Sequence, residues 1–380
     1  MEPQSTTTHD GSNPYQYTPV DENKQEIRLL TLLPGQFSAE IRVCLDIARF
    51  TKDQIPTFEA ISYTWGSAEN PVSIFIGKSS NKTLLVTQNL AEALPYFRFE
   101  DKPRVLWIDA ICVDQQNLGE RGHQVKRMAD IYSRAAKVLI WVGPEAQNSS
   151  RALKCVDLIA SKVKWDYNTQ LLLAITEDVH WADPNTELSL VHEEWIALSH
   201  LIDRPWFERL WIRQEVTLAS EAATLMCGHQ TIPWTSVCHA VACLWVKHKG
   251  RADRAFIEHF QTRLRIIVDL CYTKRGMVRD LIASTKHCVC SDPRDKIYAL
   301  LSLMSAQMAC KIEPDYTKSV HEVYRDTVLS TIRTTQFYNL DILTTVDADE
   351  HGQRFSSWIP DVCPNFPYPA QQKSCKASNM

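Results

Sequence analysis

The sequence predicts an α/β fold, in which a mostly parallel sheet with flanking helices is followed by a largely helical extension. Two continuous apolar runs, at 105–108 and 138–142, are typical of strands that are buried on both faces. A long amphipathic segment separates them, so that strand, helix and strand follow one another within about 40 residues, the size of a βαβ unit. After Gly143 the hydrophobic spacing becomes mostly helical. We therefore expect the parallel sheet in the first half of the chain.

Shorter strands precede this unit. Apolar alternation and short apolar runs predict strands at 26–33, 41–47, 58–63, 72–76 and 84–86. A helix is predicted at 89–97, because one face collects Leu90, Ala93, Leu94 and Phe97.

The helix of the βαβ unit is expected to begin just after Asn117, a residue type that favours the N-cap position. Glu120 stands three positions later, where its carboxylate would accept the Asn117 backbone N–H in a capping box. Asp130 and Arg134 are expected to form an i,i+4 ion pair. One apolar stripe along the helix is formed by Val125, Met128, Tyr132 and Ala135.

Helical patterns dominate the rest of the chain. They cover 149–163, 187–203, 205–220, 235–248, 253–273, 276–286 and 315–335. A small hairpin is predicted from 223 to 233, and Asp292-Pro293 predicts the start of a further helix. We divide the chain into a disordered arm at 1–24, an α/β domain at 25–219, a mainly helical region at 220–361 and an irregular tail at 362–380.

Composition narrows the class of protein. With 380 residues and 44% hydrophobic content, the chain can bury a large core. A net charge of -4 gives no support to nucleic-acid binding. No apolar run approaches the roughly 18 residues of a membrane span, and the polar amino end lacks the apolar stretch of a signal peptide. We therefore expect a cytoplasmic protein whose 12 cysteines are mostly reduced.

The polar turn after the first apolar run is the predicted site. In parallel α/β sheets, ligands bind beyond the carboxyl ends of the strands. Five residues with reactive or hydrogen-bonding side chains fall there, namely Asp109, Cys112, Asp114, Gln115 and Glu120.

Four separated blocks carry a family resemblance. The first is FEAISYTWG at 58–66, and the second runs from LWIDAICVDQ at 106–115 through ERGHQVKRMADIYSRAAKVLIWVG at 120–143. The third is RPWFERLWIRQEV at 204–216, and the fourth is DPRDKIYALLSL at 292–303, with PDY at 314–316 and SSWIPD at 356–361. In their order and spacing the blocks resemble the fungal heterokaryon incompatibility domain, called the HET domain. The resemblance covers 26–361, and the defining domain lies at about 58–219.

This resemblance implies an intracellular fungal protein of self/non-self recognition, whose activation triggers a cell-death reaction through self-association or a protein partner. HET domains are considered similar in fold to TIR domains, which have a flavodoxin-like parallel sheet. Some TIR relatives hydrolyse NAD at its nicotinamide bond and others only assemble, so the resemblance leaves open whether this chain is an enzyme. Two positions depart from the family pattern, because this chain has Asp114 where Asn is common and Asn117 where Asp is common.

In the enzymatic alternative NAD is the substrate, and Glu120 and Asp109 are the catalytic carboxylates. Cleavage of a glycosidic bond passes through an oxocarbenium-like state, which a nearby carboxylate stabilises. Trp65 would stack on a base of the substrate, and Arg213 would hold a phosphate. The expected ligand-binding residues are Trp65, Gly66, Cys112, Gln115, Arg121 and Arg213.

The same residues also have structural interpretations. Glu120 would complete the capping box, Asp109 would accept hydrogen bonds from loop N–H groups, and Trp65 would belong to the core. Arg213 and Arg294 lie within apolar helical stripes, so we expect each to contact a carboxylate, because a buried charge is costly unless it is paired.

A cysteine nucleophile is a further alternative. Cys112 would be activated by His123, with Asp109 as the orienting group, and a helix amino end would lower the thiol pKa. No pair of closely spaced cysteine or histidine ligands recurs as a zinc site requires, so no metal site is predicted.

Overall fold

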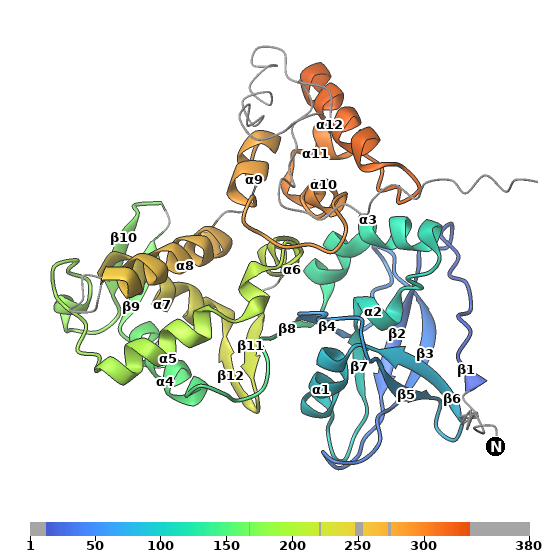
Figure 1. Ribbon diagram of the computed structural model, residues 1–380, viewed down its shortest axis with the longest axis horizontal. Helices are drawn as coiled ribbons and strands as arrows, with labels where there is room; N and C mark the ends of the chain where they lie inside the picture. Colours follow the sequence, from blue (N-terminus) through green and yellow to red (C-terminus); the bar gives the residue numbers. More distant parts are fainter. Residues whose placement is uncertain (1–12, 167, 220–221, 248–253, 273–274, 335–380) are drawn as a thin grey trace, which may run out of the picture.

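The computed structural model describes residues 13–166, 168–219, 222–247, 254–272 and 275–334. A 10-stranded mixed sheet crosses the molecule in the order β1-β6-β5-β3-β2-β7-β4-β8-β11-β12 (Figure 1). Its strands are β1 (Asn13–Pro14), β2 (Glu26–Leu32), β3 (Arg42–Arg49), β4 (Glu59–Tyr63), β5 (Val72–Ile76), β6 (Lys82–Val86), β7 (Arg104–Trp107), β8 (Lys137–Trp141), β11 (Thr224–Cys227) and β12 (Gln230–Pro233). A separate small sheet pairs β9 (Val163–Asp166) with β10 (Leu171–Ala174).

Helices cover the sheet and form most of the second half. The α-helices are α1 (Gln88–Phe97), α2 (Asp109–Cys112), α3 (Leu118–Arg134), α4 (Ser149–Ala160), α5 (His192–Ile202), α6 (Ile212–Thr217), α7 (Trp234–Lys247), α8 (Arg254–Tyr272), α9 (Val278–Ser284), α10 (Asp295–Tyr298), α11 (Ala306–Ala309) and α12 (Val320–Thr334). Short 3-10 helices are η1 (Val179–Trp181), η2 (Pro205–Glu208) and η3 (Leu301–Leu303). None of the described helices is long and apolar enough to cross a membrane.

Four parallel strands form the centre of the sheet and confirm the predicted α/β class. β4 pairs in parallel with β7 on one side and with β8 on the other, and β8 pairs in parallel with β11. Counted along the chain, their spatial order is 2-1-3-4, which is the order of flavodoxin-type sheets. Ala60, Ile61, Ser62 and Tyr63 are all buried, as expected for a strand covered on both faces.

The sheet crosses the domain limit that we placed at 219. β11 lies beyond that limit, yet Thr224 and Leu225 pair with Leu139 and Ile140 of β8. The predicted hairpin, formed by β11 and β12, is confirmed, and it adds two strands to the α/β sheet at the start of the region that we described as mainly helical.

Residues 13–24, which we assigned to a disordered arm, make specific contacts with the α/β part. The Tyr15 N–H donates to the Thr83 carbonyl over 2.8 Å, and the Tyr17 hydroxyl donates to the Ile111 carbonyl over 3.0 Å. Thr18 accepts a hydrogen bond from Arg28. Residues 1–12 and the predicted tail at 362–380 lie outside the described residues.

The helix predicted from Asp292-Pro293 is shorter than its apolar spacing suggests. The Ala299 N–H still bonds four residues back, to Asp295, but the Leu300 N–H bonds three residues back, to Ile297. The chain therefore tightens from α10 towards η3. The apolar side chains of this segment remain buried, because they pack with Tyr316 and α12 in a second hydrophobic core.

Two hydrophobic cores meet at α3 and α6. The larger core fills both faces of the sheet, and the smaller one joins α9 to α12, which lie together beside α3 in Figure 1. Val125 and Trp211 pack against both cores. The predicted apolar stripe of α3 thus serves the sheet and, through Val125, the C-terminal helices.

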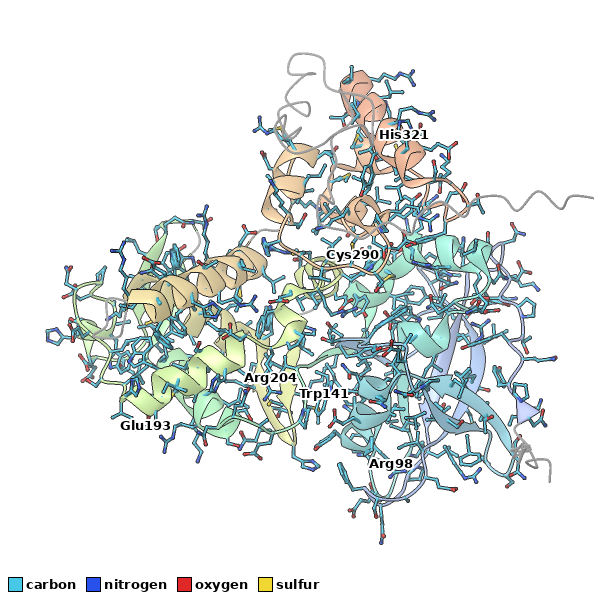
Figure 2. All side chains as sticks on the ribbon, in the orientation of Figure 1. Arg98, Trp141, Glu193, Arg204, Cys290 and His321 are labelled. Carbon is cyan, nitrogen blue, oxygen red and sulfur yellow. The ribbon has the colours of Figure 1, made fainter. Side chains whose placement is uncertain are left out.

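Arg204, labelled in Figure 2, joins the start of the third block to the loop after β8. Its Nη1 donates to the carbonyls of Val142 and Pro144 over 3.2 and 3.1 Å. Gly143 has a φ of 111°, and a Cβ there would lie 2.8 Å from Arg204 Nη1. Glycine is therefore required both for the backbone conformation and for the close approach of the guanidinium.

Candidate functional site

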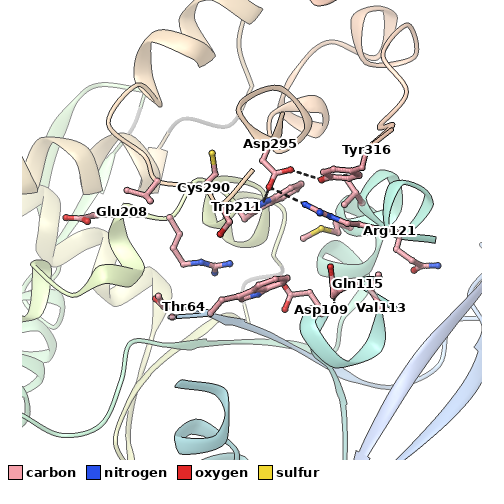
Figure 3. A pocket seen from close by; sticks show the side chains of 18 of the residues that line it. Thr64, Asp109, Val113, Gln115, Arg121, Glu208, Trp211, Cys290, Asp295 and Tyr316 are labelled. Atoms are coloured by element: carbon pink, nitrogen blue, oxygen red, sulfur yellow. Dashed lines mark hydrogen bonds and ion pairs between the residues drawn. The ribbon is translucent and has the colours of Figure 1, made fainter. Parts of the chain in front are cut away.

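A pocket of about 300 Å³ lies beyond the carboxyl ends of β4 and β7 (Figure 3). One wall comes from the loops after these strands and from α3, and the other from the segments 205–211, 289–295 and Tyr316. The pocket therefore spans the junction of the two hydrophobic cores. Its lining consists of Thr64, Trp65, Gly66, Trp107, Asp109, Val113, Gln115, Arg121, Gln124, Val125, Met128, Pro205, Glu208, Arg209, Trp211, Val289, Cys290, Ser291, Asp295 and Tyr316.

Asp109 lines this pocket next to Trp65. Its Oδ2 accepts the Trp65 indole N–H over 2.9 Å, and its Oδ1 accepts the Ala110 N–H over 2.8 Å. The Gln115 amide donates to the Asp109 backbone carbonyl over 2.9 Å. Burial raises the pKa of Asp109, while the positive charge of Arg209 opposes the shift. Asp109, Trp65 and Gln115 thus form one connected group, as the position beyond the strand end predicts.

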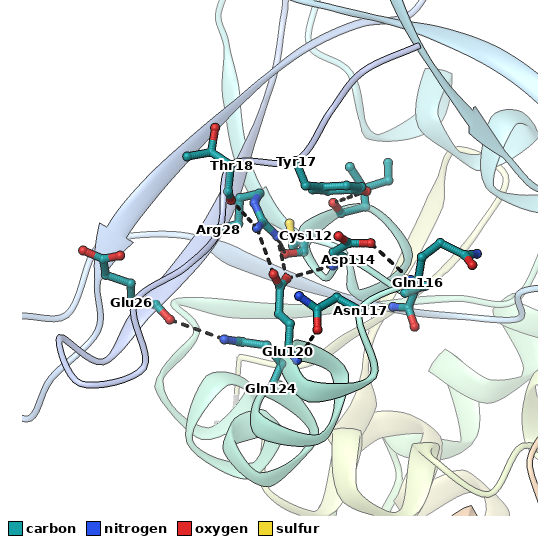
Figure 4. Close-up of polar contacts among 12 residues, drawn as sticks. Tyr17, Thr18, Glu26, Arg28, Cys112, Asp114, Gln116, Asn117, Glu120 and Gln124 are labelled. Carbon is teal, nitrogen blue, oxygen red and sulfur yellow. Dashed lines mark hydrogen bonds and ion pairs between the residues drawn. The ribbon is translucent and has the colours of Figure 1, made fainter. Parts of the chain in front are cut away.

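Glu120 is separated from that group. It does not line the pocket and is held by Arg28, with Oε1 at 2.8 Å from Nη1 and Oε2 at 3.2 Å from Nη2 (Figure 4). The side chains of Arg28 and Glu120 are only 1% and 5% exposed. Arg28 also donates to the carbonyls of Cys112 and Thr18, both over 2.7 Å. Because both carboxylate oxygens of Glu120 accept hydrogen bonds from the Arg28 guanidinium, no substrate can bind beside them.

The capping box is only half confirmed. Asn117 is the N-cap of α3, and its Oδ1 accepts the Glu120 N–H over 3.1 Å. The Glu120 carboxylate does not return to the Asn117 backbone. Its Oε1 accepts the Asp114 N–H over 2.8 Å, because Arg28 draws the carboxylate towards the interior and the turn lies between them.

The opposite wall of the pocket is an aromatic and charged cluster around Asp295. The carboxylate accepts the Tyr316 hydroxyl over 2.6 Å and the Trp211 indole N–H over 3.1 Å. The Arg121 guanidinium lies 3.7 Å from the centre of the Tyr316 ring and 3.9 Å from Asp295. Burial raises the pKa of Asp295 to about 6. Arg121 therefore lines the pocket, but its guanidinium already contacts Tyr316 and Asp295, and its ligand-binding role stays a prediction.

Arg209 and Glu215 were not selected from the sequence. Arg209 lines the pocket, and its Nη1 lies 3.5 Å from Oε2 of the fully buried Glu215. The Ser62 hydroxyl donates to Glu215 and in turn accepts the Trp206 indole N–H over 2.9 Å. Burial raises the pKa of Glu215 to about 7. The available signal was the charge of both residues within the largely apolar third block.

Of the other predicted ligand-binding residues, Gly66 lines the pocket and Arg213 does not. Gly66 lines the pocket with a φ of 75°, and a Cβ there would lie 2.6 Å from the Asn89 side chain. Arg213 lies outside the pocket lining and pairs with Asp269 over 2.8 Å, which confirms the expected contact with a carboxylate and gives no support to phosphate binding. Arg294 likewise pairs with Asp292 over 2.8 Å.

The cysteine nucleophile is not supported. Cys112 is 2% exposed and does not line the pocket. Burial raises the pKa of its thiol to about 12, contrary to the expected lowering at a helix amino end. His123 contacts Glu22 over 3.3 Å. Tight packing of the turn against β2 outweighs the favourable effect of the helix terminus.

Comparison with known proteins finds one family model and one curated relative to which parts of the chain are similar. Residues 58–215 match the family described as "Heterokaryon incompatibility protein (HET)". The chain is 25% identical over 362 residues to "Heterokaryon incompatibility protein 6, OR allele" of Neurospora crassa. The similarity covers 83% of this chain and 53% of the relative, so the chain spans about half the length of this curated relative. No solved structure matches the chain significantly. The TIR-like core therefore stays a prediction.

Proposed function

We propose that this chain acts in heterokaryon incompatibility, as a module that recognises non-self and triggers a cell-death response. The match of residues 58–215 to the HET family carries the proposal, and the similarity to the Neurospora protein supports it. The matched range contains the carboxyl ends of β4 and β7 and the loops after them, which form one wall of the pocket. We place the protein in the cytoplasm, and its output is self-association or binding to a protein partner.

The site geometry favours this proposal over the NAD hydrolase alternative. That alternative needed Glu120 and Asp109 beside one substrate, but Glu120 is enclosed by Arg28 and the Asp114 N–H, away from the pocket. A carboxylate whose oxygens are engaged by a buried guanidinium is a structural group. Asp109 remains accessible from the pocket, where it can take part in binding.

Inducible expression in a filamentous fungus tests the proposal. We expect a loss of viability after induction, measured as uptake of a vital dye, in a strain that carries a different incompatibility background. Light scattering of the purified protein over a range of concentrations should show self-association, or else a protein partner should co-purify from dying cells. Unchanged viability in every background tested would contradict the proposal.

A direct assay separates this role from the enzyme. We expect no release of nicotinamide when the purified protein is incubated with NAD at any protein concentration. Release that disappears in Glu120→Gln, with folding retained by circular dichroism, would establish the hydrolase instead.

A further inference from the structure

We propose that the pocket at the junction of the two cores binds a small planar aromatic molecule that carries a hydrogen-bond-accepting oxygen and no phosphate. The inference concerns binding alone and does not depend on the role in incompatibility. A pocket of about 300 Å³ is large enough for a bicyclic ring system. It is also built from residues far apart in the sequence, so that a ligand would contact both cores at once.

Aromatic walls define the shape of the ligand. Trp65, Trp107, Trp211 and Tyr316 all line the pocket, and each comes from a different segment of the chain. The indoles of Trp65 and Trp211 are oriented by hydrogen bonds to Asp109 and Asp295, over 2.9 and 3.1 Å. Both rings are half-buried and keep part of their surface open to the pocket. Such fixed indoles favour stacking with flat rings.

Two unsatisfied donors define the polar group of the ligand. Trp107 is fully buried, and its indole N–H has no hydrogen-bond partner among the described residues. Nη1 of Arg209 is also buried without a hydrogen bond to any described residue, and its nearest charged neighbour, Glu215, lies 3.5 Å away. A buried donor without an acceptor is unfavourable. A carbonyl oxygen on the ligand would supply the acceptor that the protein does not.

The charges around the pocket exclude phosphate. Three carboxyl groups line it, from Asp109, Glu208 and Asp295, against two guanidinium groups, from Arg121 and Arg209. Both arginines already face carboxylates, at 3.5 Å for Arg121 to Asp292 and 3.5 Å for Arg209 to Glu215. A site for phosphate offers cations that are free to pair bidentately. Here a phosphate would meet more negative than positive charge.

Binding of small aromatic probes to the purified full-length chain tests the proposal. We expect indole-3-carboxamide and benzamide to saturate a change in tryptophan fluorescence, with dissociation constants confirmed by calorimetry. Phenyl phosphate, a ring of similar size that carries a phosphate, should not saturate. Failure of both amides to bind, or tighter binding of phenyl phosphate, would overturn the proposal.

Two variants assign the binding to this pocket. Trp107→Phe keeps a ring but removes the N–H donor, and we expect it to weaken binding of the amides by about tenfold. Trp181→Phe is the control, because Trp181 lies in η1 and does not line the pocket. If Trp107→Phe does not fold, Trp65→Leu replaces it, since Trp65 is half-buried and contributes a stacking face. Equal affinity in the wild type and in the pocket variants would place the probes elsewhere and refute the assignment.

Discussion

Asp109 begins the short helix α2 and Glu120 lies in the first turn of α3, and the two carboxylates have opposite surroundings. Glu120 is held by the Arg28 guanidinium and the Asp114 N–H, and the Tyr17 ring lies 4.7 Å from the guanidinium carbon. Asp109 has the Trp65 indole and one backbone N–H, and burial raises its pKa. Both carboxylates belong to the second of the four blocks, within 12 residues of each other. The difference lies in their partners, because Glu120 is enclosed by protein groups while Asp109 lines the pocket.

The largest effect is expected on the Glu120 side. Arg28→Ala leaves the Glu120 carboxylate buried without its cation, so the free energy of unfolding should fall by about 3–5 kcal/mol. Urea denaturation measures this change. The double variant Arg28→Met with Glu120→Leu removes both charges and should recover much of the loss, because the desolvation of the two ions disappears with them.

Lys126→Ala provides the matched control for the removal of a cation. Lys126 pairs with Glu313 over 2.6 Å, but these side chains are 54% and 65% exposed. A solvated pair of this kind contributes about 0–1 kcal/mol. Equal losses from Arg28→Ala and Lys126→Ala would show that burial does not distinguish the two pairs.

The pocket side is expected to respond to pH. Burial raises the pKa of Glu215 from 4.5 to about 7, so the folded state holds this proton more tightly than the unfolded chain. The added stability is fully present below about pH 4.5 and is lost as the pH rises towards 7, with a total on the order of 3 kcal/mol. Urea denaturation from pH 4.5 to 7.5 should therefore show a flatter profile for Glu215→Gln than for the wild type.

Glu193→Gln is the control for this profile, because Glu193 is exposed in the first turn of α5. The free energy of unfolding of the Glu193→Gln variant should show the same pH dependence as that of the wild type. A Glu215→Gln curve parallel to the wild type would mean that the Glu215 carboxyl does not gain a proton in the folded state over this range.

A smaller effect is expected where the C-terminal part closes over α3. A Cβ at Gly122 would lie 2.6 Å from the Pro314 carbonyl oxygen, so Gly122→Ala must displace that segment, at a cost of about 1–3 kcal/mol. Gly119→Ala on the same helix meets only Asn117 Oδ1, at 3.4 Å, and should be neutral or slightly stabilising, because alanine favours helix. Thermal unfolding compares the two. If Gly119→Ala lowers the stability as much as Gly122→Ala does, the loss comes from a change in the helix itself and not from the contact with Pro314.

Local patterns predicted the elements of the turn well. The apolar runs at 105–108 and 138–142 largely coincide with β7 and β8, and Asn117 is the N-cap of α3. The Asp130–Arg134 pair is present at 3.9 Å. Each of these features depends on residues within a few positions of one another, so that sequence spacing determines their geometry.

The partners of the charged residues could not be predicted in the same way. Arg28 is 92 residues from Glu120, and Ser62 is 153 residues from Glu215. Glu120 followed the helix-capping rule only through its backbone N–H, because the stronger charge-assisted bonds to Arg28 determined the direction of its carboxylate. The choice of partner for a buried carboxylate thus depends on which distant cation the fold brings within reach.

By itself, the sequence determined the α/β class, the position of the strand ends and the resemblance to HET domains, because these depend on local hydrophobic periodicity and on the order of short blocks. Only the tertiary structure decided that the sheet continues through β11 and β12, that Glu120 is a structural group, and that Asp295 and Tyr316 close the pocket opposite Asp109. The physical reason is that burial and charge pairing are properties of the packed chain. The turn after β7 provides the residues, and the packing of two hydrophobic cores determines which of them face the pocket.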